Sequence, residues 1–498
     1  MRQSTFTGTA LALLTHLSAN PAQIPSQMVD SWDLNVPPNI NATGHLVFDT
    51  VSSFLQHWPN TRYRNGHSLV PGIVPVGTLL YHGRSDSKLP TNPEWTATDP
   101  EHSYIFCRGA SAGGCWHLTL VAARPLNVLY FDGSSAAKMR DGPMDTQDIV
   151  GWGKVEPDRY RQERERIADL CSWGKPLGVD GFVRMEMDFE IMLCDFTAGV
   201  EVVSMANLAS SGRGGPGRGP GGPGGPRPDP GQDSFEYTAP HDFASATAGF
   251  EVIHSGSWHN RYPGDRRIKL DLTQLISFYD TALVPSLVAT RFGLKRWDHR
   301  LLGISAKDIS AVYTVPAPAG SGVDWDTLFK VVVDRYDDRL EMVRYVLNVA
   351  DEDALVTAKN AMGQFRVMLA PYIFHAAVPT AHPGNAWAAP VFEFCATSHT
   401  AYIRRSTSLS ATLTPSERLL LNAVDETNRE ICRVVVGTWA EGVAAGLDDA
   451  LPVDDPVPVD AALTQKWKAA VEGLMAWLDW SVWIKCRPGC SFEEICYL

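Results

Sequence analysis

The sequence predicts an α+β protein, in which a β-rich N-terminal domain is followed by a mostly α-helical C-terminal domain. Three observations lead to this fold class. Short segments rich in β-branched and aromatic residues dominate over residues 45–208. A Gly- and Pro-rich stretch over 209–233 has too few apolar side chains to pack, so it predicts a linker. After a mixed region over 234–320, helical patterns take over in 321–498.

Composition and charge narrow the classes of function. The chain has 498 residues, 44% of them hydrophobic, which is enough for more than one packed core. It carries 43 Lys and Arg against 56 Asp and Glu, a formal net charge of -13. Because a negative field repels phosphate, we expect neither a general nucleic-acid binder nor a binder of anionic membranes. No apolar run reaches the roughly 18 residues of a spanning helix, so no membrane span is expected.

Four segments of the N-terminal domain predict β-strands, namely 77–81, 116–121, 126–131 and 181–191. The last is the most regular, because apolar and charged residues alternate through it. A period of two over that length predicts one half-buried strand. On it Glu186, Asp188 and Glu190 would form a row of carboxylates beside Arg184, suited to cations or electron-deficient carbon. An ordinary solvated sheet face is the alternative.

Helices are expected at 159–173 in the N-terminal domain and from Asp324 onward. The run Thr414-Pro415-Ser416-Glu417 is a capping box with proline at the first helical position. It predicts a helix start, followed by an apolar run to Val436. Residues 463–484 predict another helix, with four tryptophans near its apolar face. Tryptophan at this density predicts a packing surface.

Features at the two ends of the chain favour secretion. Residues 1–22 hold a short apolar stretch, then small residues at the spacing that a signal peptidase accepts. Asn41-Ala42-Thr43 is a glycosylation sequon. The nine cysteines form no CxxC pair, and Cys486, Cys490 and Cys496 cluster in a turn-like tail. We therefore expect disulfides in the tail and no metal site.

Two segments of the N-terminal domain carry residues that could contact a ligand. The strand predicted before residue 82 ends in His82, followed by Gly83 and Arg84. Glycine at that point lets a ligand approach the backbone closely. Residues 94–104 predict a short strand, a turn and the start of a helix that carries Tyr104. Taken alone, His82 is more typical of a packed histidine at a strand end.

Together these segments resemble the ADP-ribosyltransferase superfamily, in its diphtheria-toxin and poly-ADP-ribose-polymerase branch. There a strand ends in Leu-Tyr/Trp-His-Gly, a later segment supplies a tyrosine and a late strand supplies a glutamate. His82 in LLYHGR, Tyr104 in WTATDPEHSY and Glu190 in DFEIMLCD match these positions in that order. Asp188 and Glu190 are also similar to the paired acids of the enterotoxin-like branch, although its arginine and its Ser-Thr-Ser strand are absent. The resemblance covers roughly residues 70–205, and the whole chain resembles secreted fungal proteins with no established activity.

The resemblance implies a split β-sheet domain that takes NAD as a substrate. Glu190 would stabilise the oxocarbenium-like charge that builds up as the nicotinamide glycosidic bond breaks. His82, with Gly83 and Arg84 beside it, would bind a ribose or the diphosphate, and Tyr104 would stack on nicotinamide. Attack by water would give an NAD glycohydrolase, and attack by an acceptor such as a protein would give a transferase. The sequence leaves both open, and the acceptor unknown.

Two other functions stay open. A glycoside hydrolase needs a pair of carboxylates, and Glu186 with Glu190 or Asp132 would have to supply it. Against this, both glutamates lie on one short predicted strand. The second alternative is a non-catalytic secreted protein, in which the toxin-like domain is only a scaffold and the Trp-rich helices bind a partner.

Overall fold

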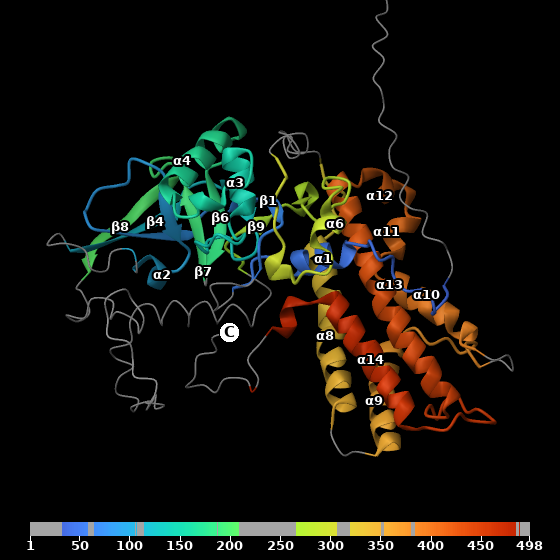
Figure 1. Cartoon of the computed structure of the whole chain (residues 1–498). Coiled ribbons are helices and arrows are strands. Elements are labelled where there is room, and N and C mark those ends of the chain that lie inside the picture. The colour runs from blue at the N-terminus through green and yellow to red at the C-terminus, as the bar shows by residue number, and fades with distance from the viewer. Residues whose placement is uncertain are drawn as a thin grey trace, which may run out of the picture.

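The computed structural model describes residues 32–57, 64–104, 106, 114–186, 188–208, 265–305, 319–349, 353–379, 384–484 and 488. It confirms the predicted fold class, because a β-sheet domain lies beside a bundle of α-helices (Figure 1). The predicted signal peptide at 1–22, the linker at 209–233 and the three tail cysteines Cys486, Cys490 and Cys496 lie outside the described residues.

The ten strands found in these ranges form one mixed sheet in the order β10-β1-β5-β6-β7-β3-β2-β4-β8, with β9 also paired to β1. Neighbouring strands are antiparallel, apart from β5 and β6, which run parallel. The strands are β1 (Ser68–Val74), β2 (Leu79–Arg84), β3 (Glu94–Ala97), β4 (Cys115–Ala122), β5 (Leu126–Phe131), β6 (Gly181–Glu186), β7 (Asp188–Leu193), β8 (Val200–Leu208), β9 (Lys269–Leu270) and β10 (Ile276–Ser277).

The sheet narrows between β2 and β3. These two strands are in register at one residue pair, Tyr81 opposite Ala97, whereas β2 is paired with β4 from Leu79 to Arg84. The expected split sheet is thus a single sheet, whose two halves meet at this narrow junction.

Residues 265–305, part of the region expected to be mixed, complete the sheet. Both short strands in this range pair with β1, since Leu270 lies opposite Gly72 and Ile276 lies opposite Leu69. Two residues are too few for an alternating pattern to be recognised in the sequence. The sheet domain therefore includes chain that follows the predicted linker.

The prediction of one half-buried strand over 181–191 is wrong. The chain reverses after Glu186, so that β6 and β7 are antiparallel and Arg184 lies opposite Glu190. β7 is buried along its whole length. The alternation runs through both strands, and neither glycine nor proline marks the reversal. Arg184 and Glu190 are therefore a cross-strand pair of opposite charge, not neighbours in a row along one strand.

Helices cover the sheet and build the bundle. They are α1 (Gly44–Ser52), α2 (Pro100–Tyr104), α3 (Asp145–Trp152), α4 (Glu163–Gly174), α6 (Leu287–Arg291), α8 (Trp325–Leu347), α9 (Ala354–Leu369), α10 (Ala389–Thr397), α11 (Ala401–Arg405), α12 (Thr407–Thr412), α13 (Pro415–Ala444) and α14 (Ala461–Leu478). Single 3-10 turns lie at 157–159, 175–177, 272–274, 296–298, 386–388 and 481–483. None of the helices within the described ranges is long and apolar enough to cross a membrane.

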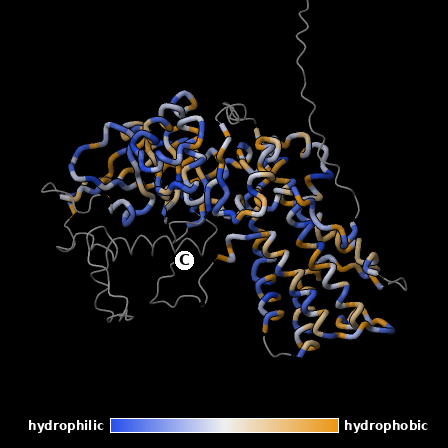
Figure 2. Tube along the Cα trace, viewed as in Figure 1, coloured by the Kyte–Doolittle hydropathy of each residue, from blue (hydrophilic) through white to orange (hydrophobic). Residues whose placement is uncertain are grey.

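The bundle helices are amphipathic, and their starts follow the sequence signals. Hydrophobic and hydrophilic residues recur in turn along them (Figure 2). The capping box at α13 is confirmed, because the Thr414 hydroxyl accepts from Glu417 N at 3.1 Å and Glu417 Oε2 accepts from Thr414 N at 2.8 Å. Glu417 Oε1 also accepts from Trp325 Nε1 of α8 at 3.0 Å, so one buried carboxylate holds the first turns of two helices.

The helix expected over 463–484 ends at Leu478. Asp479 takes a positive φ of 44°, and a 3-10 turn follows. Trp467 and Trp480 are buried, in agreement with a packing surface. Elsewhere in the bundle, a disulfide between Cys395 and Cys432 ties α10 to α13.

The first described helix, α1, packs in the bundle although it precedes the sheet in the sequence. It contacts α13 and α8, and Gly44 N donates to Glu426 Oε2 of α13 at 2.9 Å. The expected domain at 45–208 therefore begins with a segment that packs against the C-terminal helices.

The carboxylate of Asp49 on α1 joins segments from distant parts of the chain. It forms ion pairs with Arg64 and with Arg296, the latter at 2.5 Å, and it accepts from Ser481 N at 2.6 Å. Arg64 precedes β1 and Arg296 follows β10, so both cations come from the sheet domain, whereas Asp49 and Ser481 belong to the bundle. All of these groups are buried, and together they fix the sheet domain on the bundle.

We expect Asp49→Asn to lower the free energy of unfolding by about 3–5 kcal/mol, because two buried guanidiniums lose their anion. Urea unfolding, followed by tryptophan fluorescence, measures this change. Asp158→Asn is the control, since its ion pair with Arg140 is exposed and its loss should leave stability nearly unchanged. Equal stability of the Asp49 variant and the wild type would contradict the role given to Asp49.

Candidate functional site

The three segments that carry the candidate residues are neighbours in the sheet. β2 carries His82, β3 follows it, and β7 carries Glu190, in the order β7-β3-β2. Ala97 of β3 lies opposite both Tyr81 and Glu190. The helix α2, which ends in Tyr104, contacts β2 and β3. Segments about a hundred residues apart in the sequence thus meet at one place.

Glu190 is a buried carboxylate held by an arginine and a histidine. It is 2% exposed, its Oε2 accepts from Arg184 Nε at 2.9 Å, and its Oε1 lies 3.2 Å from His102 Nε2 of α2. Arg184 is shared with Glu163 of α4, at 2.6 Å. Burial alone would raise the pKa of Glu190, but the Arg184 guanidinium and the His102 hydrogen bond outweigh it and hold that pKa well below its usual range. The result is a fixed negative charge on β7.

His82 does not meet Glu190. Residues in register share a face of the sheet, so Glu190 lies on the face of Tyr81, and the next residue, His82, points to the opposite face. The ring of His82 contacts other groups: Nδ1 lies 2.6 Å from the carbonyl oxygen of Trp95, and Nε2 lies 2.9 Å from Glu94 Oε2. The structure therefore does not bring His82, Tyr104 and Glu190 to one pocket, as the resemblance would require.

The bonds of His82 span the narrow junction of the sheet. Tyr81 and Ala97 form the one register pair of β2 and β3, and the carbonyl of Trp95 lies beyond it on β3. The imidazole Nδ1 is hydrogen-bonded to this carbonyl oxygen, in the place that a backbone N–H of a neighbouring strand would otherwise take. The resemblance implies a ligand contact for His82, but the observed contacts are those of a packed histidine at a strand end, which here joins two strands.

The remaining candidates lie close by. Gly83 is buried and lies opposite His117 of β4. Arg84 Nε pairs with Asp86 at 2.9 Å. Tyr104 is half-buried at the end of α2, next to Ser103, whose hydroxyl lies 2.7 Å from His117 Nε2. Through His102 and Ser103, α2 is thus hydrogen-bonded to β7 and to β4, and Tyr104 lies on the side of the sheet that carries Glu190.

A second group of buried charges adjoins Glu190, and the sequence did not reveal it. His57 Nδ1 lies 3.1 Å from Asp188 Oδ1, and its Nε2 lies 3.4 Å from Asp265 Oδ2. Arg267 pairs with Asp265 at 2.5 Å and with Asp99 at 2.8 Å. Burial lowers the affinity of His57 for a proton, but hydrogen bonds to the two aspartates prevail and raise its pKa. Partners that lie so far apart in the sequence leave no local pattern.

Two further observations concern the alternatives. Asp132 Oδ1 accepts from His67 N at 2.8 Å and from Ser68 N at 2.6 Å, and burial raises the pKa of Asp132 to about 7. Its carboxylate thus holds the start of β1. Glu186 lies at the end of β6, on the other arm of the hairpin from Glu190. The pair proposed for a glycoside hydrolase is therefore not on one strand.

A disulfide positions α4 over the strand of Glu190. Cys171 of α4 is bonded to Cys194, which directly follows β7. Cys115 at the start of β4 is also disulfide-bonded. The sequence predicts disulfides in the tail but not this one, because two cysteines 23 residues apart form no recognisable pattern.

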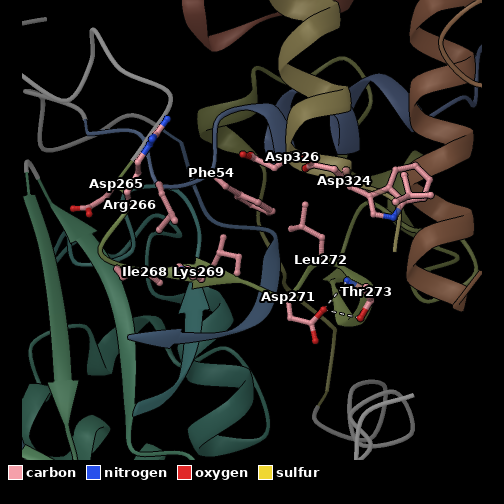
Figure 3. A pocket seen from close by; sticks show the side chains of 14 residues that line it. Phe54, Asp265, Arg266, Ile268, Lys269, Asp271, Leu272, Thr273, Asp324 and Asp326 are labelled. Carbon is pink, nitrogen blue, oxygen red and sulfur yellow. Dashed lines mark hydrogen bonds between the residues drawn. The ribbon is translucent and has the colours of Figure 1, made fainter. Parts of the chain in front are cut away.

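Three cavities of the described part of the chain lie away from the candidate residues. One, of about 460 Å³, lies between β9 and the start of α8, and its walls include Phe54, Asp265, Lys269, Asp271 and Asp326 (Figure 3). Two others lie beside the Cys171–Cys194 disulfide and between α13 and α14. His82, Tyr104 and Glu190 line none of the three. Within the described ranges, no group of three or more His, Cys, Asp or Glu side chains is placed to hold a metal ion.

Comparison with known proteins gives relatives but no activity. Residues 39–115 and 115–213 match the family described as the YPL277C N-terminal domain. Two similar Saccharomyces cerevisiae proteins are Uncharacterized protein YOR389W, 29% identical over 372 residues, and Uncharacterized protein YPL277C, 29% identical over 373 residues. Each match covers 61% of this chain, with 58% of the first relative and 75% of the second. The chain therefore spans 58% of the length of YOR389W. No solved structure matches the chain.

We expect the buried acids of β7 to make the protein acid-sensitive. Burial alone would raise the pKa of Asp188. The hydrogen bond from His57 and the charge of His57 outweigh burial and hold this pKa below its usual value of 3.8. A lowered pKa stabilises the folded state above the unfolded pKa, and this stabilisation is lost as the pH falls below about 5. Urea unfolding between pH 6 and pH 3 should show a shallower loss of stability in Asp188→Asn than in the wild type. The same slope in both proteins would contradict this assignment.

Proposed function

We propose that the sheet domain is ADP-ribosyltransferase-like, that it cleaves the nicotinamide glycosidic bond of NAD, and that ADP-ribose passes to water or to an unknown acceptor. The supporting observation is the order β7-β3-β2, which makes neighbours of the three segments that resemble that superfamily. The contact of His102 with Glu190 adds to it, because it keeps α2, with Tyr104 at its end, against the carboxylate strand.

In the proposed reaction Glu190 acts through its charge. The bond between ribose C1 and the nicotinamide nitrogen breaks, and nicotinamide leaves with the electron pair. The positive charge left at C1 is stabilised by a carboxylate that is already ionised and held in place. Water then bonds to C1 and gives up a proton to solvent, which completes a hydrolysis. An acceptor group in place of water completes a transfer.

The burial of Glu190 sets a condition for this chemistry. A ribose can reach the carboxylate only when His102 gives up its 3.2 Å contact, because Glu190 is 2% exposed in the described structure. Arg184, on the neighbouring strand, would still hold the other carboxylate oxygen. His82 has a positioning role in this proposal, since its ring bonds β3 to β2 on the opposite face.

The proposal predicts that the purified full chain releases nicotinamide from NAD without any added acceptor. Glu190→Gln should lower kcat on the order of 100-fold, since it removes one preorganised charge and keeps the side-chain size. Chromatography of released nicotinamide measures the rate. Glu163→Gln is the matched control, because it removes the other carboxylate of Arg184 and leaves Glu190 in place.

Folding and activity are separated by measuring thermal unfolding of both variants. Loss of activity in Glu190→Gln, with Glu163→Gln still active and both proteins folded, supports the proposal. Equal loss in both variants would mean that the Arg184 network matters only for structure, and it would contradict the role of Glu190. A wild type that neither releases nicotinamide nor binds NAD in calorimetry would leave a non-catalytic, partner-binding protein as the better proposal.

A further inference from the structure

The glycosylation sequon lies in a part of the fold where a modification can be accommodated. Asn41-Ala42-Thr43 is the one Asn-X-Ser/Thr sequence in the 498 residues. It stands in the segment that leads into α1, and Asn41 is exposed. A turn shapes this segment, since Ala42 N donates to the carbonyl oxygen of Asn39 at 2.8 Å and Asn41 N donates to Asn39 Oδ1 at 2.9 Å.

The side chain of Asn41 takes no part in holding the fold. Its backbone N–H is used in the turn, but its carboxamide makes no hydrogen bond in the described part of the chain. The fold continues immediately afterwards, where Gly44 N is bonded to Glu426 of α13. A group attached to the exposed Asn41 amide would therefore extend into solvent from the segment before α1.

The surroundings of Asn41 are unusually apolar for an exposed segment. Ile40 is 83% exposed, the most of any large hydrophobic residue in the described ranges, and Val36 is 46% exposed. Association with another chain would remove such apolar surface from water, which is favourable. A bulky, hydrophilic group on Asn41 would shield both of them.

We propose that Asn41 carries an N-linked glycan and that the protein matures in the secretory pathway. The side-chain amide nitrogen attacks the anomeric carbon of an oligosaccharide carried on a lipid pyrophosphate. The new N–C bond forms as the bond from carbon to phosphate oxygen breaks, the lipid pyrophosphate leaves, and the amide loses one proton. The disulfides Cys171–Cys194 and Cys395–Cys432 are an independent sign of an oxidising compartment.

The test uses the full chain expressed in a yeast host. Peptide N-glycosidase should produce one downward shift in the mass of the wild type. Asn41→Gln and Thr43→Ala should lack both the glycan and the shift, whereas Thr43→Ser keeps the sequon and should retain them. Asn35→Gln is the matched control, because it changes a nearby exposed asparagine that is followed by Val36 and Pro37.

The shielding role has its own readout. Asn41→Gln should show more self-association in light scattering than Asn35→Gln, and Asn41→Gln combined with Ile40→Ser should restore the wild-type behaviour. No mass shift in the wild type would overturn the proposal, whether its disulfides are oxidised or reduced. A shift that persists in Asn41→Gln would overturn it as well. Neither result depends on whether the protein cleaves NAD.

Discussion

The buried carboxylate of Asp49 is the interaction on which the two-part architecture depends. Asp49 comes from the first described helix and Ser481 from the last described turn. Of the two arginines that it pairs with, one precedes β1 and the other follows β10 in the sequence. Burying any one of these charged side chains is favourable only when its partners are buried with it, because an unpaired buried charge costs far more free energy than a paired one. The sheet domain and the bundle therefore depend on each other, and a cut at the predicted linker would not give two independent folds.

The same principle governs the site. β7 is lined by acids that would be intolerable in a core if they were alone, and each has a partner from another element: Arg184 from β6, His102 from α2 and His57 from the segment after α1. Such a network can serve catalysis, because it keeps a carboxylate ionised, or it can serve structure alone. The exclusion of water strengthens the attraction between these charges, and this favours the catalytic role and the structural role alike.

Local signals in the sequence predicted local structure well. The capping box gave the start of α13, Asp324 marked the start of α8, and three of the four predicted strands correspond to β2, β4 and β5. The hairpin at 181–193 was missed because its alternation passes through the reversal. The charged groups around Asp188 were missed for a different reason: His57 pairs with Asp188, Asp265 pairs with both His57 and Arg267, and the fold brings these residues there from distant parts of the sequence. The acidic residues of the site could thus be predicted from the sequence, but the histidines that contact them could not.

At the narrow junction between β2 and β3, side chains supply bonds that the backbone supplies elsewhere in the sheet. One register pair and the imidazole of His82 join β2 to β3 directly, and α2 adds hydrogen bonds to β7 and to β4. The β6–β7 and β2–β4 pairs, in contrast, are joined along six residue pairs each. Both ring nitrogens of His82 contact β3, because Nδ1 contacts the carbonyl oxygen of Trp95 and Nε2 contacts the carboxylate of Glu94. Without this ring, β2 and β3 would be joined to each other by a single register pair.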